Sequence, residues 1–66
     1  MSHEVIIANY MRHIYNGWVT TREMDAEFVA AVEIYVNENP GVSIDEFSAR
    51  GVSSNVIDAL NLRAAA

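Results

Sequence analysis

Residues 39–63 read NPGVSIDEFSARGVSSNVIDALNLR. Pro40-Gly41 cannot continue a helix, so this stretch opens with a helix stop. Ser43 then starts a short helix as the first residue of a Ser-x-x-Glu capping box, and Gly51 ends that helix. A further helix follows, capped by Ser53 or Ser54. We therefore predict two short helices, over about residues 44–50 and 54–63, joined by a tight turn.

The preceding part of the chain predicts two longer helices. Ser2 caps the first, over about residues 3–16, and Asn16-Gly17 ends it because glycine adopts the left-handed conformation at little cost. The second, over about residues 21–38, opens with Thr20-Thr21-Arg22-Glu23, a Thr-x-x-Glu capping box. The connection between these two helices is short, so we expect them to form an antiparallel hairpin.

Apolar residues recur at helical spacing in all four segments, and no alternating strand pattern persists. The sequence therefore predicts an all-α fold, a small four-helix domain that spans residues 1–66. The first two helices are apolar around much of their girth, which is typical of helices that are central or covered by a partner. The residues expected to be buried are Ile7, Met11, Ile14, Trp18, Met24, Phe28, Ala31, Val32, Tyr35, Ile44, Phe47, Val56, Ile57, Leu60 and Leu62.

The composition narrows the possible partners and compartments. The chain has 66 residues, 52% of them hydrophobic, and no cysteine, so disulfides and thiol catalysis are excluded. Its net charge of −5 arises from nine acids against four arginines and no lysine. This balance disfavours anionic membranes and non-specific binding to nucleic acid. With no apolar run of membrane-spanning length and no signal-like start, we expect a cytoplasmic protein without a membrane partner.

No group of residues indicates catalysis or metal binding. His3 and His13 are separated by about 15 Å along one helix. Glu23 and Asp25 lie in the first turn of the second helix, where the helix dipole favours negative charge. No glycine-rich phosphate loop is present. We therefore predict a protein that is not an enzyme and that has no cofactor and no metal.

The aromatic residues of the first helix indicate a protein interface. Tyr10 and Tyr15 cannot both lie on the face of Met11 and Ile14, and tyrosine exposed beside methionine and isoleucine is typical of interfaces. We predict a small acidic regulatory or adaptor protein that binds a protein partner, itself as a homodimer, or both. As a short, acidic, cysteine-free chain of one domain, it resembles accessory proteins of phages and mobile elements. The expected interface residues are Ile6, Tyr10, Arg12 and Tyr15, with Asp25 and Glu27 as an acidic steering surface.

Residues 42–62 also resemble a helix-turn-helix. The resemblance rests on the Ser43 start, the Gly51-Val52-Ser53 turn and the apolar residues of both short helices. It implies an alternative function, a DNA-binding transcriptional regulator, in which Asn55 could contact adenine. Asp58 beside it would repel phosphate, so we prefer protein binding. Under this alternative, the DNA-binding residues are Arg50, Ser54, Asn55, Asn61 and Arg63.

Overall fold

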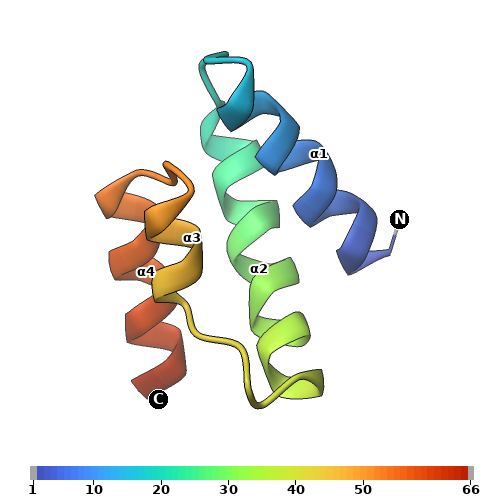
Figure 1. The fold of residues 1–66 in the computed structure, drawn as a ribbon, viewed down its shortest axis with the longest axis vertical. Helices are drawn as coiled ribbons and strands as arrows, with labels where there is room; N and C mark the ends of the chain where they lie inside the picture. Colours follow the sequence, from blue (N-terminus) through green and yellow to red (C-terminus); the bar gives the residue numbers. More distant parts are fainter. Residues whose placement is uncertain (1, 66) are drawn as a thin grey trace.

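The structure is a computed structural model that describes the backbone of residues 2–65 and the side chains of residues 2–63. This part of the chain forms four α-helices and no strand, which confirms the predicted all-α fold (Figure 1). The predicted ranges agree with the observed bounds to within two residues. The helices are α1 (His3–Tyr15), α2 (Arg22–Glu38), α3 (Asp45–Ala49) and α4 (Ser54–Ala65).

The long helix α2 lies at the centre of the molecule. α1 packs against one side of it as an antiparallel hairpin, and α4 packs against the other side with α3 beside it (Figure 1). Among the described residues, no close backbone contact joins α1 to α3 or α4. The central helix therefore holds two groups of helices apart, α1 on one side and the α3–α4 pair on the other.

Side-chain caps fix where the two longer helices begin. The Ser2 hydroxyl accepts a hydrogen bond from the Val5 amide at 3.3 Å, as the sequence predicts. α2 is capped by Thr21, whose hydroxyl accepts from the Met24 amide at 3.1 Å. The capping box predicted to start at Thr20 was thus wrong by one residue, because the Thr20 hydroxyl donates instead to the Asp25 carboxylate at 2.8 Å.

α3 has Ile44 as its N-cap, so the capping box predicted to start at Ser43 was wrong. The Ser43 hydroxyl accepts from the Asp45 amide at 3.2 Å.

Two glycines provide the turns that need positive φ. Gly17 follows α1 with a φ of 71°, and Gly51 lies between α3 and α4 with a φ of 101°. A Cβ at Gly51 would lie 3.2 Å from Cγ2 of Ile14. The turn between α3 and α4 therefore comes into close contact with α1, although the helices themselves stay apart.

The core forms around Phe28, which is fully buried on α2. Its ring stacks on that of Tyr10 with centroids 4.0 Å apart, and meets Phe47 edge to face at 5.6 Å. Aromatic contacts thus tie α1 and α3 to the central helix. The buried hydrophobic cluster consists of Tyr10, Met11, Phe28, Val29, Val32, Phe47, Val52, Val56, Ile57 and Leu60.

Two residues that were expected in the core lie outside it. Trp18 is 56% exposed because it follows the Gly17 turn, and its ring packs edge-on against His13 at 5.1 Å. Leu62 is 74% exposed. It comes two residues after the buried Leu60, about 200° further around α4, and therefore lies on the face turned away from α2.

Candidate functional site

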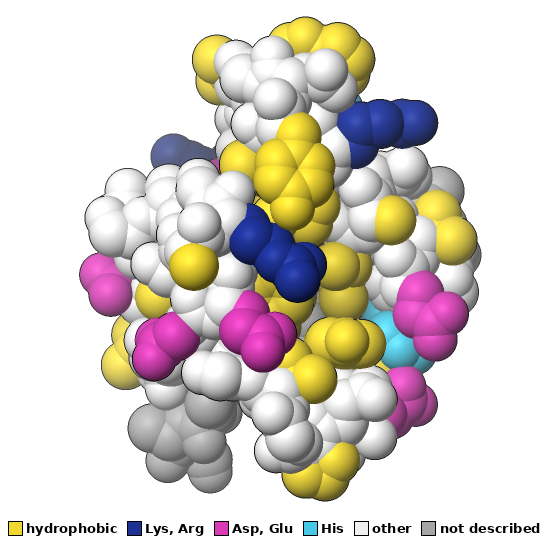
Figure 2. Space-filling view, viewed as in Figure 1, with side chains coloured by type: hydrophobic (Ala, Val, Ile, Leu, Met, Phe, Trp, Pro, Cys, Tyr) yellow, Lys and Arg dark blue, Asp and Glu magenta, His cyan; other side chains and the backbone are white. Residues whose placement is uncertain are grey.

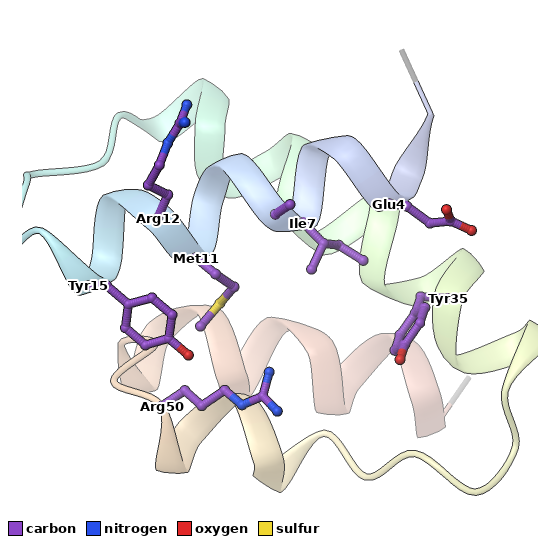
Figure 3. Close-up of a pocket in the computed structure, with 8 residues that line it drawn as sticks. Glu4, Ile7, Met11, Arg12, Tyr15, Tyr35 and Arg50 are labelled. Atoms are coloured by element: carbon purple, nitrogen blue, oxygen red, sulfur yellow. The ribbon is translucent and has the colours of Figure 1, made fainter.

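An open groove lies between α1 and the turn that follows α3 (Figure 3). Its volume is about 410 Å³. In the space-filling view, apolar side chains gather between α1 and the α3–α4 pair, with a cationic side chain lying across them (Figure 2). The residues that line the groove are Glu4, Ile7, Ala8, Met11, Arg12, Tyr15, Tyr35 and Arg50.

Three elements build the groove. α1 contributes an exposed row at helical spacing, Glu4, Ala8 and Arg12, and its more buried neighbours Ile7 and Met11. α2 contributes Tyr35, which is half-buried. Arg50, the C-cap residue of α3, reaches in from the opposite wall. Because α2 holds α1 and α3 apart, the apolar side chains between them stay partly uncovered.

The charges of the groove are separated along its length. Arg50 reaches in from the α3 side beside Tyr15, Arg12 projects from α1 away from Arg50, and Glu4 lies at the other end of α1 (Figure 3). Neither arginine forms an ion pair among the described residues. Arg12 Nη2 makes only a 3.4 Å hydrogen bond to Asn9 Oδ1. In a protein with a net charge of −5, α1 and the facing wall thus each carry an arginine that pairs with no described carboxylate.

Tyr10 does not line this groove, and the expectation that it is exposed was wrong. It is only 3% exposed, and its hydroxyl donates to Asp25 Oδ1 at 2.8 Å. Two effects raise the pKa of Tyr10 to about 12: burial, which is the larger, and the hydrogen bond to Asp25. A tyrosine can be buried where its hydroxyl finds a partner, which the periodicity of α1 does not reveal. Asp25 is occupied by this bond and by that of Thr20, so its Oδ1 faces two internal donors.

The remaining predicted interface residues fall into two places. Arg12 and Tyr15 line the groove together, and Tyr15 is 67% exposed. Ile6 and Glu27 instead line, together with the buried Tyr10, a smaller hollow of about 170 Å³. The structure therefore brings together two of the six residues in the groove.

Sequence reasoning missed several residues of this surface. Ile7, Met11 and Tyr35 were expected only as core, and Arg50 only as a DNA contact. One signal could have indicated this wall of the groove: Glu4, Ala8 and Arg12 are four residues apart and therefore lie in one row along the helix. Val19, at 92% exposure in the loop after α1, was also missed.

The predicted DNA-binding residues do not form a continuous cationic face. Ser54, Asn55 and Asn61 are exposed on α4. Arg63, on the same helix, pairs with Glu33 of α2 at 2.8 Å. Arg50 faces the groove beside α1. The two arginines of the predicted set therefore lie in different parts of the molecule, and Arg63 already pairs with a carboxylate.

Comparison of the chain with protein-family models, with curated proteins and with solved structures finds no match. Within residues 2–63, no group of three or more His, Asp or Glu side chains is placed to hold a metal ion. No described helix is long and apolar enough to cross a membrane. Function is therefore inferred from the groove itself.

Proposed function

We propose that this chain is a small, acidic, non-catalytic regulatory or adaptor protein that acts by binding a protein segment in the groove. The observation that carries the proposal is Tyr15, a well-exposed aromatic residue of a groove whose two arginines, Arg12 and Arg50, form no ion pair with a described carboxylate. Tyrosine and arginine are the residue types enriched, with tryptophan, at the energetic centres of protein interfaces. Their combination over an apolar floor favours recognition of protein.

The groove defines the kind of segment that fits it. Ile7, Met11 and Tyr35 offer apolar area that a partner's apolar side chains would cover. Arg12 and Arg50 favour a carboxylate at the Tyr15 end, where charge-assisted hydrogen bonds to guanidinium groups are available. A cleft between helices with apolar anchors suits an amphipathic helix laid along it.

The DNA-binding alternative draws less support from the arrangement of charge. Duplex recognition needs clustered cations that anchor the phosphate backbone. The Arg63 guanidinium is held by Glu33, and Asp58 is exposed on α4. Protein binding accounts for Arg50 and for the exposed Tyr15, whereas DNA binding by α4 uses neither the groove nor Tyr15.

A photo-crosslinking residue placed at Ala8 tests the proposal. Ala8 lines the groove, and Ala30 is a matched exposed alanine on α2 that lies outside it. We expect crosslinks to one defined protein from position 8 and not from position 30. The crosslinked protein is then purified, and its affinity for wild-type and variant chains is measured by titration calorimetry.

Two variants and a charge-matched control make that titration decisive. Tyr15→Ala and Arg50→Glu should each weaken binding about tenfold or more, as expected for residues at the centre of an interface. Arg22→Glu makes the same charge change on α2, outside the groove, and should leave affinity within about twofold. Equal crosslinking from both alanines would contradict the proposal. Salt-sensitive binding of duplex DNA that Arg63→Ala abolishes would favour the alternative.

A further inference from the structure

We propose that the groove is occupied by a second copy of this chain, with the two α1 helices packed antiparallel about a two-fold axis beside Ala8. This inference names the partner of the groove and so rests on the proposed function. It starts from the exposed row of α1, in which Glu4 and Arg12 stand four residues on either side of Ala8.

The spacing of this row makes α1 complementary to itself. A rise of 1.5 Å per residue places Glu4 and Arg12 about 6 Å along the helix from Ala8, in opposite directions. A two-fold axis at Ala8 reverses the second helix, so that Glu4 of each copy faces Arg12 of the other. A parallel pair would set Glu4 against Glu4 and Arg12 against Arg12. The charges therefore select the antiparallel arrangement.

Ala8 suits the position nearest the axis. Its side chain is exposed and short, so two helices can approach closely where they cross. The row of residues four apart is also the ridge that interdigitates in the commonest class of helix packing, with axes crossing at about 50°. A long or charged side chain at position 8 would meet its own copy at the axis.

The charges on this face are available for a partner. The Glu4 carboxylate lies 3.9 Å from His3 Nε2, and the side chain of Glu4 is 76% exposed. Nε2 of His3 lies nearer to Glu38, at 3.0 Å, without a well-directed hydrogen bond. Arg12 has only its long contact with Asn9.

Arg50, on the opposite wall, lies beside Tyr15 and Met11, whereas Arg12 points away from it (Figure 3). The contact with Glu4 of the second copy is therefore made by Arg12. Two chains of charge −5 repel each other overall, and this local placement of cations offsets that repulsion at the contact.

Sedimentation equilibrium of the full chain, from low micromolar to millimolar concentration, tests the proposal. We expect a reversible dimer, and Glu4→Arg or Arg12→Glu should each weaken it about tenfold or more, because both ion pairs become repulsive. An equal mixture of these two variants should recover a heterodimer of near wild-type affinity, since each attraction is then restored. Glu46→Arg and Arg22→Glu carry the same charge changes at exposed positions outside the groove and should leave the dimer intact.

Ala8→Glu provides an independent check, because it places two like charges at the axis and should also dissociate the dimer. Circular dichroism of each variant shows whether the helices are kept. A chain that stays monomeric throughout, a dimer indifferent to Glu4→Arg and Arg12→Glu, or a mixture that fails to re-associate would overturn the proposal. In the first two cases, crosslinking of a different protein from position 8 would still support the proposed function. If crosslinking from position 8 captures no other protein in those two cases, the proposed function fails as well.

Discussion

The two sides of α1 differ in what covers them. Toward α2, Tyr10 is buried, stacked on Phe28 and hydrogen-bonded to Asp25. Toward Arg50, Tyr15 is exposed at the end of an open groove. The two tyrosines are five residues apart on one helix, yet only the first has both a facing aromatic ring and an acceptor for its hydroxyl. A tyrosine on an apolar helix is thus buried or exposed according to the partner that the opposing element supplies.

This difference separates the residues expected to act in stability from those proposed to act in binding. The side of α1 that faces α2 is covered along the hairpin and holds the core together. On the groove side, the turn at Gly51 approaches Ile14, while Arg12 and Tyr15 stay exposed. Substitutions on the first side should therefore change the free energy of unfolding, and substitutions on the second side should change binding.

The largest effect is expected for Phe28→Ala. This change removes the ring that both Tyr10 and Phe47 contact, and should lower the free energy of unfolding by about 3–5 kcal/mol. For a chain of this length that is comparable to the whole stability, so the variant should be largely unfolded at 25 °C. Urea denaturation followed by circular dichroism measures it. A cooperative transition displaced by less than about 1 kcal/mol would show that α1 is held by something other than this stack.

An intermediate effect is expected at alkaline pH. The pKa of Tyr10 is raised to about 12 in the folded state and is about 10 when the chain unfolds, so the folded state holds its proton longer. The resulting stabilisation is complete below pH 10 and is lost as the pH rises through 12. It amounts to about 2 kcal/mol between pH 9 and pH 11.5. The unfolding free energy is measured at pH 9 and at pH 11.5 for the wild type and for Tyr10→Phe. The loss of stability between the two pH values should be about 2 kcal/mol larger for the wild type. Equal losses in the two proteins would show that Tyr10 keeps an ordinary pKa.

The smallest effect on folding is expected for Tyr15→Ala. An exposed side chain without a hydrogen-bond partner among the described residues should change the unfolding free energy by no more than about 0.5 kcal/mol. Urea denaturation at low micromolar concentration, where self-association contributes little, measures it. A loss above about 2 kcal/mol would place Tyr15 in the core and remove the contrast between the two sides of α1.

The helices could be predicted because their signals are local. Ser2, Gly17 and Pro40-Gly41 act through the chain immediately beside them, and they fixed the ends of the two longer helices to within two residues. The burial of particular side chains could not be predicted in the same way. Tyr10 and Trp18 both have apolar neighbours in the sequence. Tyr10 is buried because its hydroxyl bonds to Asp25, whereas Trp18 is exposed because it follows the turn at Gly17.

The groove was predictable only in part. Arg12 and Tyr15 were found because they are exposed on one helix whose periodicity is readable. Arg50 was assigned to DNA contact because its approach to α1 depends on where α3, which packs against α4, lies relative to α1. That relation joins residues far apart in the sequence, and no pattern within α3 expresses it.

Gly51 influences the width of the groove because it has no Cβ. Because Gly51 has no Cβ, the turn can pack against Ile14, and the neighbouring Arg50 lies across the groove from α1. Any other residue would act as a wedge there, because its Cβ would stand 3.2 Å from the Ile14 methyl on a backbone that L side chains rarely adopt. Gly51 thus affects the width of the groove without lining it.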